Sequence, residues 1–178
     1  MNICVFCGSS VGFSSVYADS AKELGMLIGQ QDHTLIYGGG NVGLMGIVAD
    51  AVLQNGGKAI GIIPDFLMQR EVGHYGLTKL EVVPSMHERK KRMADLSDAF
   101  IATAGGWGTL EETAEILTWK QLGLIHQPVG ILNTNGFFDA LISQMKLMVQ
   151  EGFLNPANLE SVKINSSPSN LLSQFIPR

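Results

Sequence analysis

Short runs of apolar, often β-branched residues alternate with longer amphipathic stretches along almost the whole chain. Such short apolar runs are typical of strands buried on both faces of a parallel sheet, and they predict strands at residues 3–6, 34–37, 59–63, 80–83, 99–102, 129–132 and 162–164. Apolar residues at helical spacing predict helices at 15–30, 43–55, 86–96, 109–122 and 137–151, and Ser167 is a candidate cap for a short last helix. This alternation predicts an α/β fold, a single Rossmann-like domain over residues 1–178 with helices on both faces of a parallel sheet.

One segment, residues 65–78, breaks the alternation. It contains Gly73, Gly76 and scattered polar residues, and it joins two predicted strands without a convincing helix. A connection of this length without a helix is uncommon in a compact domain, so we expect a mobile loop here.

Composition narrows the function classes. A hydrophobic fraction of 46% in 178 residues is enough for one core. The formal net charge of -4 argues against a general nucleic-acid binder, so any bound anion must meet positive charge locally. No apolar run approaches the roughly 20 residues of a membrane span, and MNICVFCGSS has no basic segment before its apolar stretch. We therefore expect a soluble, cytoplasmic protein that binds neither nucleic acid nor membranes.

The cysteines, histidines and serines of the chain do not form a recognisable metal site or nucleophilic site. Cys4 and Cys7 form a C-x-x-C, but they begin inside a predicted buried strand and no second ligand pair accompanies them. We interpret them as reduced structural cysteines. The four histidines lack metal-binding spacing, and no G-x-S-x-G elbow is present, so no metal and no serine-hydrolase triad are predicted.

Three glycine clusters directly follow predicted strands. They are Gly8-Ser9-Ser10, Gly38-Gly39-Gly40 and the run from Gly105 to Thr109. Ligands of an open parallel sheet lie outside the carboxyl ends of its strands, where the next helix offers free N–H groups to an anion. Each cluster could instead serve only as a tight turn, but three together favour a phosphate ligand. The spacing matches neither a P-loop nor G-x-G-x-x-G, so NAD and ATP are not supported.

The sequence AGGWGTLEE is the most specific indication of a ligand site. Residues 105–109 can surround a phosphate, and Glu111 and Glu112 follow in the first turns of the next helix. Acids near a helix start often only stabilise the helix dipole. A carboxylate one turn beyond a phosphate is also placed to meet the sugar carbon of a nucleotide.

The sequence SMHERKKRM supplies positive charge. Ser85 and Glu88 are a capping box for a helix that carries Arg89 and the run Lys90 to Arg92. Such a run is often a solvated helix face, but in an acidic protein it is also the obvious partner for an anion.

Together, SMHERKKRM and AGGWGTLEE strongly resemble motifs of the LONELY GUY family, the cytokinin riboside 5′-monophosphate phosphoribohydrolases that are often mislabelled as lysine decarboxylases. CVFCGSS, LIYGGGNVGLMG, IGIIP, TWKQLG and EGF also resemble family signatures, so the similarity covers residues 1 to 155 almost completely. Nothing marks a Schiff-base lysine, so the decarboxylase label has no support in the sequence. The resemblance implies a Rossmann-like homodimer that needs no cofactor.

The resemblance also implies roles for individual residues. Arg89 and Glu112 match the catalytic pair of the family, and Glu71 and Thr118 match outlying ligand contacts. The residues that match its nucleotide-binding loop are Lys90, Gly106, Trp107, Gly108, Thr109, Leu110, Glu111 and Glu112, to which we add Gly105. Ala104 departs from the family, which usually has proline before this loop.

These observations predict a hydrolase that cuts the N-glycosidic bond of a purine nucleoside 5′-monophosphate, AMP or prenylated AMP, to give free base and ribose 5-phosphate. Glu112 would stabilise the oxocarbenium-like state and either activate water or attack directly. The alternatives are a general AMP nucleosidase and a nucleotide-binding carrier without turnover. We expect a homodimer also because Met86, Met93, Leu117 and Trp119 exceed what one sheet face needs.

Overall fold

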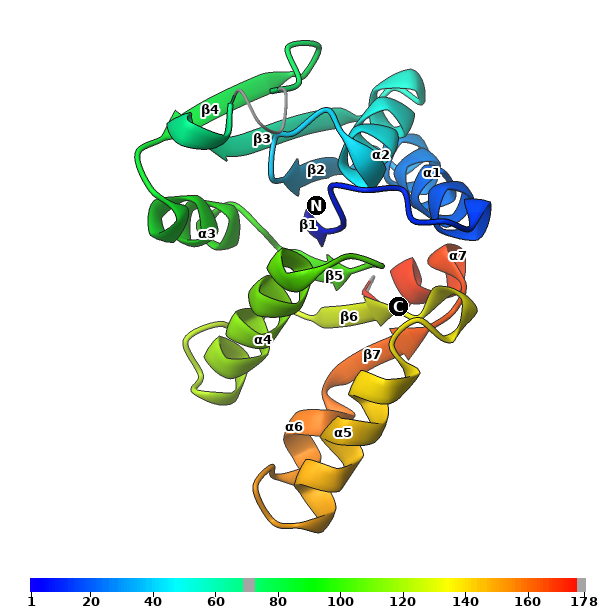
Figure 1. The fold of residues 1–178 in the computed structure, drawn as a ribbon, viewed down its shortest axis with the longest axis vertical. Helices are drawn as coiled ribbons and strands as arrows, with labels where there is room; N and C mark the ends of the chain where they lie inside the picture. The colour runs from blue at the N-terminus through cyan, green and yellow to red at the C-terminus, as the bar shows by residue number, and fades with distance from the viewer. Residues whose placement is uncertain (69–72, 176–178) are drawn as a thin grey trace.

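A seven-stranded sheet, parallel throughout, forms the centre of the molecule (Figure 1). The computed structural model describes residues 1–68 and 73–175. The strands are β1 (Asn2–Phe6), β2 (Thr34–Tyr37), β3 (Lys58–Pro64), β4 (Lys79–Val83), β5 (Ala99–Ala102), β6 (Val129–Leu132) and β7 (Val162–Asn165). All seven predicted strands are confirmed, with boundaries that differ by at most one residue.

The helices agree nearly as well with the sequence pattern. They are α1 (Ser15–Gln30), α2 (Gly43–Gln54), α3 (Met86–Asp95), α4 (Trp107–Gln121), α5 (Asp139–Gln150), α6 (Pro156–Glu160) and α7 (Pro168–Leu172). Ser167 caps α7 as predicted, because its hydroxyl accepts a hydrogen bond from Asn170 N. The helix α6 was not predicted. Its five residues are too few to show a helical period, and its start is marked by Asn155, which accepts from Ala157 N, and by Pro156 at its first position.

Two predicted helix starts were wrong by two residues. Helix α4 begins at Trp107 instead of residue 109, because Gly106 already serves as its cap. Helix α5 begins at Asp139 instead of residue 137, because a 3-10 turn, η2 (Thr134–Gly136), precedes it and contains Asn135 at a φ of 53°. The sequence pattern does not distinguish such a turn from the first turn of a helix.

Alternate residues of each strand pack against helices on opposite faces of the sheet. Ile3 and Val5 of β1 belong to a core with side chains of α1, α2 and α7, whereas Cys4 and Phe6 pack on the other face with side chains of α3 and α4. Helix α5 continues this second layer over β5 to β7 (Figure 1). The predicted α/β fold with helices on both faces is confirmed.

The strand order places a ligand crevice at one position. The order is β4-β3-β2-β1-β5-β6-β7, so the chain builds the sheet outward from β1 in one direction and then returns to β5 and builds in the other. This reversal between β1 and β5 is the topological switch point at which open α/β sheets bind ligands, outside the carboxyl ends of the strands. The predicted glycine clusters follow β1, β2 and β5, which are neighbours in the sheet.

The connection from β3 to β4 begins with a 3-10 turn, η1 (Asp65–Leu67), and returns to the sheet through an isolated antiparallel bridge between Gly40 and Gly73. Glu71, a predicted ligand contact, lies outside the described residues. The mobility expected for this segment stays a prediction.

Three of the four apolar side chains on which the dimer prediction depends, Met93, Leu117 and Trp119, pack into the core of the chain itself. Met93 is 1% exposed and packs beneath the sheet, and Leu117 and Trp119 lie half-buried against the same core. These side chains of α3 and α4 share that core with strand residues such as Phe100 and Val129. The apolar side chains that do lie exposed include Leu122, Leu124 and Phe153.

Within the described residues, no helix is both long enough and apolar enough to span a bilayer.

Candidate active site

The glycine turn after β1 contacts the turn after β5 and the start of α2 through its backbone. Gly8 N donates to Ala104 O at 3.0 Å, and Leu44 N donates to Gly8 O at 3.0 Å. A Cβ on Gly43 would lie 2.2 Å from the carbonyl carbon of Ser9, and one on Gly105 would lie 2.1 Å from Thr109 Oγ1. Only glycine permits these approaches. The wall of the crevice at the β1 and β5 ends is therefore mainly main chain.

A pocket of about 230 Å³ opens at this wall. It is lined by Val5, Cys7, Gly8, Ser9, Gly38, Met45, Leu67, Met86, Arg89, Met93, Gly106, Trp107, Gly108, Thr109, Glu111 and Glu112. The pocket thus brings together the two motifs that carry the family resemblance, although they are separated in sequence and lie on different helices.

Arg89 is held in this pocket by main-chain carbonyl groups. Its helix starts where Glu88 N donates to Ser85 Oγ at 3.2 Å, which confirms the predicted cap, and Arg89 is 5% exposed. Its Nε donates to Ile62 O at 3.1 Å and its Nη2 donates to Gly38 O at 2.9 Å. A Cβ on Gly38 would lie 1.9 Å from Nη2, so the glycine is needed for the guanidinium to approach. These carbonyl groups fix the orientation of the guanidinium in the pocket.

Glu112 lies in the second turn of α4, half-buried and on the pocket wall. Glu112 and Arg89 are both close enough to Cys4 to shift the pKa of its thiol. Burial raises the pKa of Cys4 well above its ordinary value, Glu112 raises it further, and Arg89 acts in the opposite direction. A carboxylate and a guanidinium therefore share the region at the end of β1.

The start of α4 has the features of an anion site. Gly106 is the cap residue and provides no side-chain hydrogen bond to the first turn, and the first turn contains no acidic residue. The N–H groups at a helix start have no partner within the helix and carry partial positive charge. Because residues 106–109 line the pocket, a phosphate can meet these groups there.

The basic run divides between this pocket and the surface. Lys90 pairs with Glu111 and with Glu115 on α4, and it is absent from the pocket lining. Lys91 pairs with Asp95 at 2.6 Å, and Arg92 pairs with Glu81 at 2.7 Å. The interpretation of the whole run as the anion partner was therefore too broad, because successive helical residues point in different directions. Only Arg89 of this run lines the pocket.

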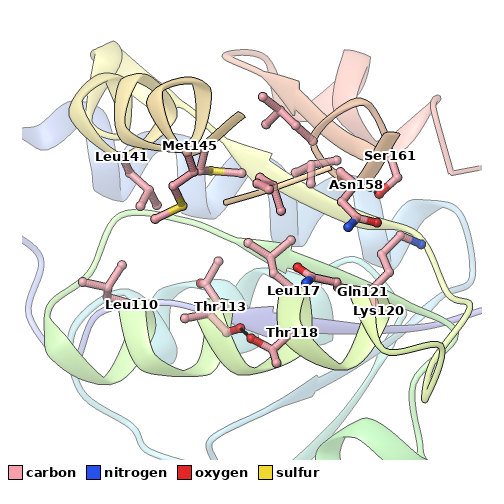
Figure 2. Close-up of a pocket in the computed structure, with 15 residues that line it drawn as sticks. Leu110, Thr113, Leu117, Thr118, Lys120, Gln121, Leu141, Met145, Asn158 and Ser161 are labelled. Atoms are coloured by element: carbon pink, nitrogen blue, oxygen red, sulfur yellow. Dashed lines mark hydrogen bonds between the residues drawn. The ribbon is translucent and has the colours of Figure 1, made fainter. Parts of the chain in front are cut away.

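Two other predicted ligand contacts, Leu110 and Thr118, lie on a different side of α4. They line a second, largely apolar pocket of about 220 Å³ between α4, α5 and α6. Figure 2 shows Leu110 and Leu117 of α4 pointing toward Leu141 and Met145 of α5. In this chain the structure does not bring Leu110 or Thr118 to Arg89 and Glu112.

Several lining residues were not predicted, among them Leu67, Met45 and Met86. Met86, Arg89 and Met93 are spaced so that they share one face of α3, so the position of Arg89 could have identified both methionines. No sequence signal marks Leu67, which reaches the pocket from the turn after β3.

Comparisons with known proteins identify similar proteins along almost the whole chain. A family model described as possible lysine decarboxylase matches residues 45–175. The chain is 44% identical over 179 residues to a cytokinin riboside 5′-monophosphate phosphoribohydrolase of Arabidopsis thaliana, and the match covers 99% of this chain and 84% of that protein. A probable enzyme of the same name from Oryza sativa subsp. japonica is 44% identical over 173 residues, which cover 97% of this chain and 71% of that protein. Among solved structures, the molybdenum cofactor binding protein of the phototrophic bacterium Rippkaea orientalis matches with a TM-score of 0.71 and 26% identity, over 97% of this chain and 93% of that one.

Proposed function

The chain belongs to the LONELY GUY family of phosphoribohydrolases and is an N-glycosyl hydrolase, and from this premise we propose that it cleaves N6-modified adenosine 5′-monophosphates to free base and ribose 5-phosphate. The observation that carries the proposal is that Arg89 of α3 and Glu112 of α4 line one pocket together with the glycine start of α4. A phosphate site and a carboxylate within one small pocket match a substrate that has a phosphate at one end of its sugar and a base at the other.

In the proposed mechanism the phosphate lies at residues 105–109, where the N–H groups of α4 receive it. This binding is remote from the bond that breaks, so its energy serves to position the anomeric carbon. The bond between that carbon and the base nitrogen breaks, and positive charge develops on the sugar. The carboxylate of Glu112 stabilises this charge and either activates the water that adds to the carbon or attacks the carbon itself.

Arg89 is proposed to anchor the substrate in the same pocket. Its guanidinium is oriented by Ile62 O and Gly38 O, so it binds the sugar or phosphate with little loss of side-chain freedom. A positive charge here also aids departure of the base with its electron pair.

The methionines of the pocket support an apolar substituent on the base. Met45, Met86 and Met93 line it together with Leu67. Unbranched, polarizable methionine side chains adapt to irregular apolar groups, which is what a prenyl chain on N6 would present.

We also propose that the enzyme works as a homodimer. Exposed apolar side chains on and beyond α4 and α5 include Leu122, Leu124, Leu147 and Phe153. Exposed apolar groups gathered on neighbouring elements often mark an interface.

The test is chromatography of the purified protein with prenylated AMP, AMP and adenosine. We expect free base and ribose 5-phosphate from both nucleotides, faster from the prenylated one, and little reaction with adenosine. Equal specificity constants for AMP and adenosine would contradict the phosphate site. A folded protein that binds both nucleotides without releasing base would favour the alternative of a nucleotide-binding carrier without turnover.

A further inference from the structure

His74 is a buried titratable residue that the proposed mechanism does not use. It lies just before β4 and is 7% exposed. Its Nε2 is 2.9 Å from Asp50 Oδ1 on α2, and its Nδ1 accepts a hydrogen bond from Gly76 N at 3.1 Å. Both ring nitrogens therefore have partners, and these come from different parts of the fold.

The hydrogen bonds to Gly76 N and Asp50 determine which tautomer of the His74 ring is present. Because Nδ1 accepts from an N–H group, it carries no proton, so the proton of the neutral ring is on Nε2 and is donated to the Asp50 carboxylate. A protonated ring would turn an N–H toward the Gly76 N–H. The geometry is that of a neutral histidine oriented by a carboxylate.

The backbone of His74 leads directly to the pocket. His74 N donates to Gly39 O at 2.9 Å, and the neighbouring Gly73 forms the isolated bridge with Gly40. The next carbonyl back along this turn, Gly38 O, accepts from Arg89 Nη2. One turn of three glycines, residues 38–40, therefore lies between His74 on one side and Arg89 on the other.

This turn packs closely against β3, where a Cβ on Gly61 would lie 2.5 Å from Gly39 Cα. Its glycines have no side chains with which to anchor it, and Gly39 has a φ of 76°. Glycine also has the greatest backbone freedom to lose on folding. The position of the Gly38 carbonyl therefore depends on what holds the turn from outside.

We propose that His74 is a positioning residue: with Asp50 it fixes the glycine turn 38–40, so that Gly38 O holds the guanidinium of Arg89 in the pocket. The side-chain bond to α2 and the main-chain bond to Gly39 act together, since the first keeps the residue in place for the second. The inference rests on the proposed role of Arg89, and it adds a residue outside the pocket to the machinery of that role.

The experiment compares His74→Phe, which keeps a ring but loses both hydrogen bonds, with His74→Gln, which keeps a terminal N–H for Asp50, and with Asp50→Ala. The matched control is Ser20→Ala, which removes another buried hydrogen bond, the 2.8 Å contact with Thr134. Two quantities are measured: the exchange rate of the Arg89 Nε–H proton by NMR, and kcat and KM for AMP well below the melting temperature.

In His74→Phe and Asp50→Ala we expect the Arg89 proton to exchange about tenfold faster, because the carbonyls that hold it become mobile. We expect kcat to fall by about tenfold from the misplaced guanidinium. His74→Gln should show an Arg89 exchange rate and a kcat close to those of the wild type. Ser20→Ala should lower the melting temperature and change neither quantity. In an Arg89→Ala background, His74→Phe should cause no further loss of kcat, because the residue through which it acts is gone.

A lower melting temperature with normal Arg89 exchange and normal kcat would overturn the proposal and leave His74 a purely structural residue. If His74→Phe fails to fold, Asp50→Ala and His74→Gln still decide the question. A wild-type protein that does not cleave nucleotides, but whose Arg89 exchange responds to Asp50→Ala, would contradict the proposed function while supporting the positional link.

Discussion

At the scale of single residues, the adjacent acids of α4 have different surroundings. Glu111 forms an ion pair with Lys90 on α3, whereas the charge of Glu112 raises the pKa of Cys4 in the middle of β1. The glutamate pair of the sequence motif is thereby divided into one carboxylate engaged by a lysine and one near Arg89.

Glu112→Gln should therefore keep the fold and nucleotide binding but lower turnover by ~10²-fold or more, because the amide cannot stabilise developing positive charge. Glu111→Gln is the matched variant and should lose much less. Steady-state kinetics with prenylated AMP and binding by calorimetry check both. A larger loss in Glu111→Gln would exchange the two assignments.

The two cysteines should differ in reactivity. Neither forms a disulfide, Cys4 is fully buried with a raised pKa, and Cys7 is half-buried on the pocket wall. Since the thiolate is the reactive form, iodoacetamide should label Cys7 well before Cys4, and saturating AMP should slow labelling of Cys7. Peptide mass spectrometry over time measures both. Labelling of Cys7 at an unchanged rate in AMP would show that the nucleotide lies elsewhere.

Ala104→Pro restores the residue that the family usually has before the phosphate loop. Ala104 is 6% exposed, and its carbonyl accepts from Gly8 N, a bond that proline preserves. We expect added stability of about 0.4–1 kcal/mol, because proline restricts the unfolded chain. Denaturant melts and AMP kinetics test this. Destabilisation would indicate that the ring does not fit against Leu44 and Ala21, which pack around Ala104.

At the scale of elements, the ion pairs of Lys90 connect α3 to α4. The Lys90 side chain is 12% exposed and contacts Glu111 and Glu115, so it joins the helix of Arg89 to the helix of Glu112. Burial lowers the pKa of Lys90, but the bonds to Glu111 and Glu115 outweigh it and the pKa is raised. The lysine therefore stays charged, and the link holds, throughout the neutral range.

Lys90→Met should cost about 1 kcal/mol of stability, a figure that allows for solvent around the two glutamates. Lys91→Met, which breaks only an exposed pair with Asp95 on the same helix, should cost about 0.5 kcal/mol or less. Parallel urea melts compare them. Equal losses would mean that the contact between α3 and α4 adds nothing, and a large rise in KM for AMP would show that Lys90 reaches the substrate, as the family resemblance implies.

The elements were predictable because their signals are local. Buried β-branched runs identified all seven strands, and Ser85 and Ser167 marked two helix starts. Helix α6 and the true start of α5 were missed, because five residues or one 3-10 turn carry no periodic signal. The glycine turns were recognised for the same local reason, as residues that directly follow strands.

The contacts of the candidate site could be predicted only in part. The pairing of Arg89 with Glu112 came from the family resemblance, and the structure brings both to one pocket. The positions of Lys90, Leu110 and Thr118 depend on how α3 and α4 rotate against the sheet and each other. Such rotation is set by packing between distant segments, which a single sequence does not display.

At the scale of the whole molecule, the exposed apolar side chains predict the state of assembly. Light scattering at micromolar concentration should give about twice the 19.2 kDa mass of the chain. Leu124 and Phe153 are 67% and 85% exposed, and Leu124→Glu with Phe153→Glu should weaken association, because burying a charge there is costly. His126→Glu, a polar surface change near Leu124, is the control. A wild-type mass of one chain would contradict the dimer.

The backbone wall described above bears on how this enzyme could acquire new substrates. An added Cβ would lie 2.2 Å from Ser9 C at Gly43, 2.9 Å from Gly8 N at Gly105 and 3.1 Å from Gly105 Cα at Gly8, so these positions leave little or no room for a side chain. Mutation is therefore better tolerated at the side chains that line the pocket, such as Met45, Met86 and Leu67. A directed-evolution library aimed at a different base should vary those three positions and leave the glycines fixed. Its variants should change which base is released while they retain the requirement for a 5′-phosphate.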